Sequence, residues 1–102
     1  MTEFPDATPW KMYIGGEWVD ALDGETHDVI TPIDRNVVIA TVPNGKEADA
    51  DRAVKAAARA FPAWKRIVPA ERGRLLLKIA EALDARSEEL ARLIAHETGN
   101  AL

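Results

Sequence analysis

The sequence predicts an α+β fold in which two strand pairs come first and three helices follow. Up to residue 43, β-branched and aromatic residues gather in short runs separated by Gly, Pro and Asn. From residue 50 onward, apolar residues instead recur at a spacing of about 3.6 residues. Strands followed by helices are typical of α+β architecture. We therefore divide the chain into a loose N-terminal arm (residues 1–12), a strand region (13–43) and a three-helix region (44–102).

The strand region begins with a predicted hairpin around the pair Gly15-Gly16. β-prone residues stand on both sides of it, and two glycines favour the primed hairpin turns, which need positive φ angles. The same pair could be taken for a phosphate loop, but it lacks the third glycine and the following helix of a dinucleotide fingerprint. A second strand pair is expected in residues 26–30 and 37–42, because both runs are rich in β-branched residues.

Three helices are expected in the remainder of the chain. The first carries an alanine-rich stripe over residues 50–61 and is predicted to end at Pro62. The second opens at Pro69, a favoured first helical residue. The third has Ser87 as its expected N-cap and Gly99 as its C-cap. The second helix is apolar over more than one stripe, which indicates faces meant for something outside this chain: Leu75, Leu76, Leu77, Ile79 and Leu83.

Composition narrows the class of protein. A formal net charge of -4, with 47% hydrophobic and 29% charged residues, indicates a soluble globular protein and argues against nucleic acid or an anionic membrane as partner. The chain has no cysteine, which excludes a disulfide scaffold, a thiolate zinc site and a cysteine nucleophile within it. No apolar run approaches the ~20 residues of a membrane span, and the first residues lack a signal-peptide pattern. We expect a cytoplasmic location.

Few residues suggest chemistry by themselves. His27 and His96 have no metal-binding spacing, so a solvated or structural role is expected for both. Arg72 and Arg74 could grip a phosphate, but beside Glu71 they are more typical of ion-paired structure. Core or interface packing is expected for the three tryptophans, which fall on different elements: Trp10, Trp18 and Trp64.

Glu97 is the one residue that packing explains poorly. It falls on the apolar stripe of the third helix, which also carries Leu90, Leu93 and Ile94. Near a helix C-terminus, a carboxylate meets the negative end of the helix dipole. Two interpretations remain open at this point. Glu97 turns outward at the end of the helix, or a specific partner, a cation or a buried donor, neutralises it.

A series of blocks resembles the opening of aldehyde dehydrogenases. The resemblance covers residues 13–102 in the family's order and spacing, and the blocks are residues 13–19, 28–32, 38–43, 51–57, 61–64, 69–76 and 97–102. Two positions depart from the family's pattern. The turn at 32–36 differs from the more usual Asn-Pro-Ala-Thr-Gly. Lys46 stands where a Ser or Thr usually caps the first helix, so we expect a weak cap or a cap at Asn44.

The resemblance implies the N-terminal fragment of an enzyme that oxidises an aldehyde to a carboxylic acid with NAD or NADP. In this family a cysteine attacks the carbonyl, a hydride passes to the nicotinamide, and a glutamate activates the water that releases the acyl group. These groups would lie beyond residue 102. We therefore assign no catalytic and no cofactor-binding residue to this chain, and expect it to be inactive alone.

The resemblance also implies surroundings for this segment. It would be the leading part of a coenzyme-binding domain in an α/β fold, joined to the remainder of the chain and belonging to a homo-oligomer. One site is implied within it, for a sodium or potassium ion held by the backbone carbonyls of Val29 and Ile30 and the carboxylate of Glu97. Such hard cations prefer oxygen ligands. A non-catalytic interaction or structural domain on the same framework is the alternative.

Overall fold

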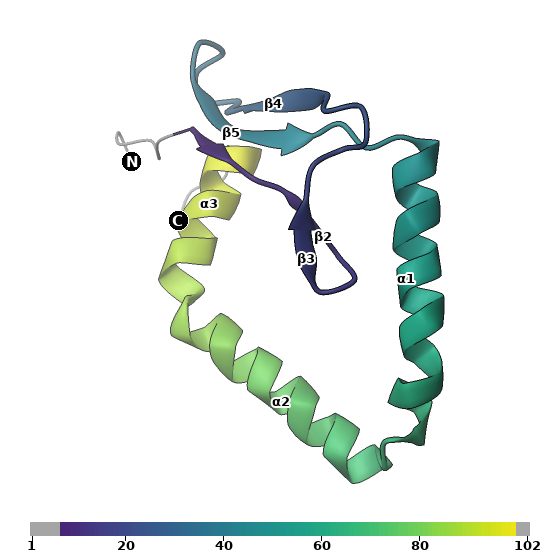
Figure 1. Cartoon of the computed structure of the whole chain (residues 1–102). Helices are drawn as coiled ribbons and strands as arrows, with labels where there is room; N and C mark the ends of the chain where they lie inside the picture. Colours follow the sequence, from purple (N-terminus) through teal and green to yellow (C-terminus); the bar gives the residue numbers. More distant parts are fainter. Residues whose placement is uncertain (1–6, 100–102) are drawn as a thin grey trace.

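The computed structural model describes residues 7–99 and has the predicted order of strands before helices (Figure 1). The α+β prediction is therefore confirmed. The strands are β1 (Thr8–Pro9), β2 (Met12–Ile14), β3 (Glu17–Val19), β4 (Thr26–Ile30) and β5 (Val38–Pro43). The helices are α1 (Glu47–Arg66), α2 (Pro69–Ala85) and α3 (Ser87–Thr98).

Strands β2 and β3 form the predicted hairpin. They pair antiparallel, with Met12 opposite Val19 and Ile14 opposite Glu17. Gly15 and Gly16 make the turn with φ angles of 61° and 84°. Residues that carry a Cβ rarely adopt two successive positive φ angles, so the turn depends on the glycines. The glycine pair is therefore a hairpin turn, as favoured by the sequence, and not a phosphate loop.

The other three strands form one sheet in the order β1-β5-β4. Strands β4 and β5 are the second predicted pair and run antiparallel, with a register shift between Val29 and Ile30. Strand β1 pairs parallel with β5, placing Thr8 opposite Ala40. We expected a loose arm over residues 1–12, but its described part is held by the sheet, because β1 supplies hydrogen-bond partners to a free edge of β5. Residues 1–6 of that arm lie outside the described residues.

The largest fully buried side chains, Ile39 and Thr31, lie in the sheet and directly after it. Ile39 and Ala40 of β5 and Ala95 of α3 are 2%, 6% and 2% exposed, respectively. Thr31, directly after β4, is completely buried. The C-terminal turn of α3 lies against the sheet at this point (Figure 1). The core of the described chain therefore sits where β5 and the end of β4 meet the end of α3.

Helix α1 differs from its prediction at its C-terminal end and has the weak cap expected at its start. It continues through Pro62 to Arg66, so the expected stop at Pro62 is wrong. Proline lacks an N–H and removes one hydrogen bond inside a helix, but its fixed φ is helical, and here the helix carries on for one more turn. At the other end Lys46 is the N-cap, and its backbone N–H donates to the Asp49 carboxylate at 3.0 Å. The N-cap residue thus makes no side-chain cap hydrogen bond, which is the weak cap expected, and Asn44 is not the cap.

Helices α2 and α3 follow the sequence closely. Pro69 is the first residue of α2, as predicted. Gly99 ends α3 with a φ of 77°, the left-handed conformation expected of a C-cap glycine. Ser87 is the first residue of α3, and Arg86 occupies the N-cap position, so the predicted cap is wrong by one residue. The reason is that only Arg86 separates the two helices, and this leaves no extended residue where Ser87 could act as a cap.

The elements enclose an open frame. The three helices form its sides, with the sheet at the top and the β2–β3 hairpin reaching inward (Figure 1). The radius of gyration is 17.2 Å, whereas a compact chain of this length would have about 13 Å. Helix α2 has no buried residue. Within the described residues, no helix combines the length and the hydropathy needed to cross a membrane.

Candidate functional site

The end of β4 and the end of α3 meet at a hydrogen bond buried in the core. The Thr31 hydroxyl donates to the backbone carbonyl of His96 at 2.7 Å and accepts from the Ile33 N–H at 3.3 Å. Pro32 and Gly99 also lie close together, since a Cβ at Gly99 would be 3.3 Å from the Pro32 ring. The junction therefore joins two segments that are far apart in the sequence.

The three predicted cation ligands belong to these two segments. Ile30 immediately precedes Thr31, and Glu97 immediately follows His96. Val29 is half-buried, and the Ile30 side chain is 50% exposed. The register shift in the sheet falls between Val29 and Ile30, where regular pairing with β5 is interrupted. The structure therefore brings the predicted ligands to one region of the fold, each one or two residues from the Thr31–His96 hydrogen bond.

Glu97 lies on a different side of α3 from the one expected. In the last turns of the helix Ala95 and His96 are buried, whereas Ile94 and Glu97 are exposed. The apolar stripe that carries Glu97 is thus not the face that packs on the sheet. Helix α3 meets the chain after β4 at Thr31, whose hydroxyl donates to the His96 carbonyl, and residues 95 and 96 are buried there. Within this chain, Glu97 is therefore exposed.

A second polar cluster, which sequence reasoning missed, fixes the start of α1. The Asp49 side chain is 4% exposed, and besides the Lys46 N–H it accepts the Leu22 N–H at 3.0 Å. Arg52 pairs with Asp49 at 2.9 Å and donates to the carbonyl of Asp20. The backbone hydrogen bonds, supported by Arg52, hold the pKa of the Asp49 carboxyl below its ordinary value. The acid at the third residue after Lys46 is the signal that could have revealed this half capping box.

Lys46 completes the attachment of the loop between β3 and β4. Its ammonium group lies 2.7 Å from the Asp23 carboxylate and 2.8 Å from that of Glu25. These hydrogen bonds lower the pKa of both carboxyls and raise the pKa of Lys46. The groups are about half exposed, so water screens their attraction. The cluster therefore holds the loop against α1. Its role is structural, and it is not a reactive site.

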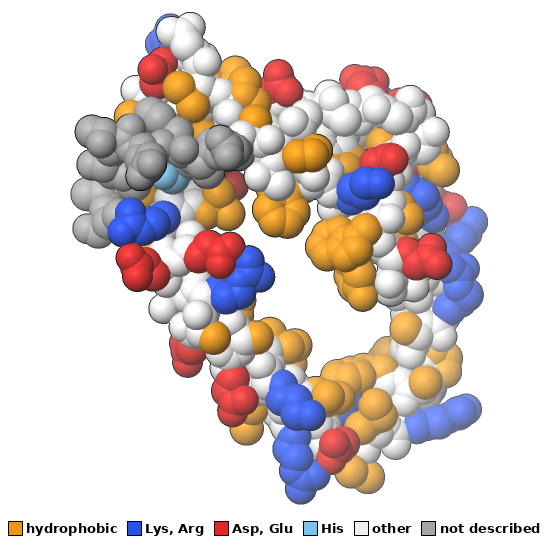
Figure 2. Space-filling model, turned by 60° about the vertical axis from the view of Figure 1, so that its left-hand side comes forward, with side chains coloured by type: hydrophobic (Ala, Val, Ile, Leu, Met, Phe, Trp, Pro, Cys, Tyr) orange, Lys and Arg blue, Asp and Glu red, His pale blue; other side chains and the backbone are white. Residues whose placement is uncertain are grey.

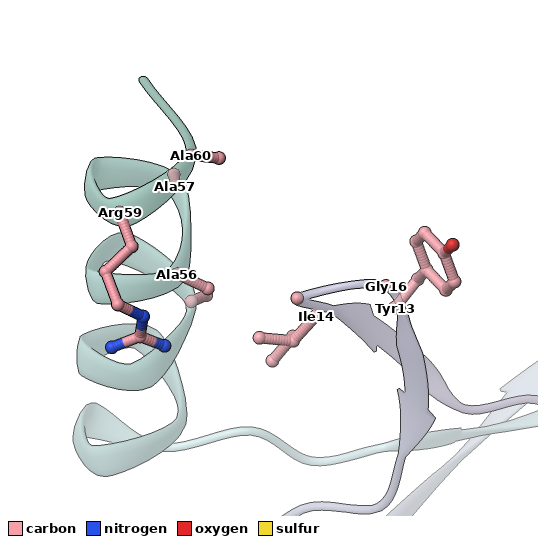
Figure 3. Close-up of a pocket in the computed structure, with 9 residues that line it drawn as sticks. Tyr13, Ile14, Gly16, Ala56, Ala57, Arg59 and Ala60 are labelled. Carbon is pink, nitrogen blue, oxygen red and sulfur yellow. The ribbon is translucent and has the colours of Figure 1, made fainter. Parts of the chain in front are cut away.

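A groove separates the tip of the hairpin from α1 (Figure 3). Ile14 points from the hairpin toward Ala56, whereas Tyr13 points away from the helix (Figure 3). A Cβ at Gly15 would lie 3.7 Å from the Ala56 side chain, so the small residues permit a close approach. The lining contains one charged residue, Arg59, and neither an acid nor a nucleophile. This groove suits packing of the hairpin on the alanine stripe rather than catalysis.

The remaining candidates have structural surroundings. His27 is exposed on β4 and His96 is buried on α3, in agreement with the solvated and structural roles expected. Arg74 forms the predicted ion pair with Glu71. All three tryptophans are exposed in this chain, Trp18 at 61%, so they are not core residues here. Among residues 7–99, no cluster of three His, Cys, Asp or Glu side chains could hold a metal ion.

Comparison with known proteins identifies the family of this chain. A sequence model of the aldehyde dehydrogenase family matches residues 18–102, more than four-fifths of the chain. The chain belongs to the aldehyde dehydrogenase family. The malonate-semialdehyde dehydrogenase 1 of Geobacillus kaustophilus is 39% identical over 97 residues, which are 95% of this chain and 20% of that protein. The α-ketoglutaric semialdehyde dehydrogenase of Bacillus subtilis is 35% identical over 102 residues, 100% of this chain and 21% of that protein.

Solved aldehyde dehydrogenases share the fold of this segment. PnpE of Pseudomonas sp. WBC-3 superposes with a TM-score of 0.81 at 48% identity, over 86% of this chain and 18% of that chain. The betaine aldehyde dehydrogenase of Staphylococcus aureus, in complex with NAD+, gives a TM-score of 0.84 at 39% identity, over 89% of this chain and 18% of that chain. The aldehyde dehydrogenase chain described here thus spans about a fifth of the length of its relatives.

Proposed function

We propose that this chain is the N-terminal segment of an NAD(P)-dependent aldehyde dehydrogenase that oxidises an aldehyde to a carboxylic acid. The observation that carries the proposal is the match of residues 18–102 to the family. Its fold is shared with solved relatives, among them one bound to NAD+. The nicotinamide cofactor and the aldehyde would bind to the remainder of the protein. We propose further that the protein is a cytoplasmic homo-oligomer, as the family resemblance implies.

In this proposal the 102 residues have a structural role and are inactive alone. The family's reaction needs a thiolate nucleophile, and the chain has no cysteine. The purified chain, mixed with NAD, NADP and a panel of aldehydes, should produce no reduced cofactor above the rate without protein. Turnover that is proportional to chain concentration and survives repurification would contradict this prediction.

A chimera tests the proposed role directly. The segment of the S. aureus betaine aldehyde dehydrogenase that matches this chain is replaced by residues 1–102, and oxidation of betaine aldehyde is followed through the absorbance of NADH. We expect activity within about tenfold of that of the parent, since the two segments share a fold at 39% identity. The same enzyme with the segment deleted is the control and should be inactive. A chimera of native size and cofactor affinity without turnover would argue instead for a non-catalytic interaction or structural domain.

We also propose the cation site for the complete protein. The carbonyls of Val29 and Ile30 and the carboxylate of Glu97 would provide oxygen ligands for a sodium or potassium ion. The proximity of both segments to the Thr31–His96 hydrogen bond supports this placement. A crystal of the chimera soaked in thallium should show anomalous density among these three groups. A lysine or arginine head group in that space, or a Glu97 carboxylate that points to solvent in the complete protein, would refute the site.

A further inference from the structure

The loop that joins the β2–β3 hairpin to the three-stranded sheet is bound to the start of α1. It comprises residues 20–25, between the end of β3 and the start of β4. Gly24 has a φ of 73°, and its N–H donates to the Ala21 carbonyl at 2.8 Å, so the loop turns back on itself. We call residues 20–25 the strap. The groups that hold its two ends differ greatly in their exposure to water.

The inner end of the strap is held at a buried carboxylate. Ala21 is 5% exposed, and the Leu22 N–H donates at 3.0 Å to the side chain of Asp49, which is 4% exposed. Arg52 pairs with Asp49 at 2.9 Å and also donates to the Asp20 carbonyl. Salt screens buried or partly buried charges much less than exposed ones. The contacts at this end should therefore persist at high ionic strength.

The outer end of the strap is held by one exposed ammonium group. The Nζ atom of Lys46 lies 2.7 Å from the Asp23 carboxylate, 2.8 Å from the Glu25 carboxylate and 3.2 Å from the Asn44 carbonyl. The three charged side chains are 47%, 48% and 54% exposed, for Lys46, Asp23 and Glu25 in turn. The screening length falls from about 10 Å at 0.1 M salt to about 3 Å at 1 M, so salt weakens such exposed pairs.

The outer end also has a backbone contact that can report on its position. The Asn44 N–H donates to the Glu25 carbonyl at 2.8 Å, and the Asn44 side-chain amide donates to the Glu25 carboxylate at 2.9 Å. Both carboxylates of this end lie against the same ammonium group, and they repel each other when its charge is screened or removed. Loss of the Lys46 contacts should therefore loosen residues 23–25 together with the hydrogen bond from Asn44.

We propose that the strap is a salt-sensitive device that opens in two steps. As ionic strength rises, residues 23–25 leave the start of α1 first, because Lys46 holds them in water. Residues 20–22 remain attached, because Asp49 holds them out of water. Ionic strength thereby controls how closely the start of β4 is tied to α1, while the end of the hairpin stays in place.

Amide hydrogen exchange of the chain, followed by NMR at one pH and one protein concentration, tests both steps. Between about 0.05 M and about 1 M NaCl, exchange of the Asn44 N–H should accelerate at least about threefold, whereas that of the Leu22 N–H should change less than about twofold. Acceleration of both amides by the same factor would overturn the inference, because the strap would then open as one unit. An Asn44 exchange rate that does not change with salt would overturn it as well.

A charge-removing variant identifies the group responsible. Lys46→Met keeps an unbranched side chain and leaves the backbone N–H that donates to Asp49 in place. At low salt its Asn44 N–H should exchange as fast as that of the unmodified chain at high salt, with no further acceleration when salt is added. The same salt response in Lys46→Met and in the unmodified chain would overturn the role of the ammonium group.

A matched control separates the strap from the many other charged groups. Figure 2 shows acidic and basic side chains next to one another at several places on the surface, so salt acts on more than one pair. Lys55→Met removes the exposed partner of Asp51, 2.8 Å away on the same helix, without changing a contact of the strap. Asn44 exchange and its salt response should stay as in the unmodified chain. Equal acceleration by Lys55→Met and Lys46→Met would mean a general charge effect and would overturn the inference.

Discussion

At the scale of single residues, Asp49 connects three parts of the chain. Its carboxylate accepts the N–H groups of Lys46 and Leu22 and pairs with Arg52, although only 4% of the residue is exposed. A buried carboxylate needs such partners to remain ionised. Because the charged form is the one stabilised, the pKa of Asp49 lies below its ordinary value of 3.8. The start of α1 and the loop after β3 are thereby held by one ionised group.

This arrangement predicts a pH dependence of stability. A carboxyl whose pKa is lower in the folded state contributes stability that is fully present above its unfolded pKa and is lost as pH falls through its folded pKa. The thermal midpoint of the chain should therefore fall as the pH is lowered below about 4. Asp49→Asn should have a lower midpoint at neutral pH and a shallower fall in acid, measured by circular dichroism at one protein concentration. Parallel pH profiles for the two proteins would contradict this role.

Thr31 is a second residue whose polar group is buried. Thr31→Val keeps the shape of the side chain but leaves the His96 carbonyl without the hydroxyl that donates to it at 2.7 Å. We expect the free energy of unfolding in urea to drop by about 1–3 kcal/mol. Thr26→Val, on the exposed start of β4, is the control and should change it by less than about 0.5 kcal/mol. Equal effects of the two substitutions would mean that the junction of β4 and α3 depends on other contacts.

At the scale of elements, two glycines illustrate opposite backbone requirements. Gly16 has a φ of 84° in the hairpin turn, whereas Gly73 lies inside α2 with no positive φ, and a Cβ at either position would meet nothing within 4 Å. Gly16→Ala should destabilise the chain by about 1–2 kcal/mol through backbone strain, and Gly73→Ala should stabilise it by about 0.5–1 kcal/mol. Urea unfolding of both variants measures the difference. A change of the same sign in both would contradict the assigned turn.

Local sequence signals predicted most elements because their causes are local. The glycine pair, the β-branched runs, Pro69 and Gly99 each act on their own backbone, and the structure confirms all of them. The stop at Pro62 and the cap at Ser87 were wrong. Where α1 ends and where α3 begins depend on the residues around Pro62 and Ser87. Neither residue determines the helix boundary alone. The Asp49 cluster was missed because its partner Leu22 is 27 positions away in the chain.

At the scale of the whole molecule, the open frame has a non-local cause. The sequence indicated that α2 carries more apolar surface than one neighbour can cover, and the structure shows Leu76, Leu77 and Ile79 exposed. The covered side of α3 was not predictable in the same way. Which face packs depends on where the helix crosses the sheet, and that crossing is fixed by Thr31, 65 residues before His96. For this reason Glu97 falls on the exposed side although its stripe is apolar.

The open frame predicts that the chain alone associates with itself. Each large apolar side chain left in water forgoes roughly 1.5–3 kcal/mol, while the net stability of a domain is only about 5–15 kcal/mol. Copies that cover one another's exposed Leu76, Ile79 and Leu83 would regain part of this free energy. Sedimentation should therefore show a mass that rises with concentration, and the thermal midpoint should rise with it. Leu83→Arg should weaken the association by about tenfold or more, and Ala85→Arg should leave it unchanged. A monomer with a cooperative, concentration-independent melt would show that the frame is stable with these side chains in water.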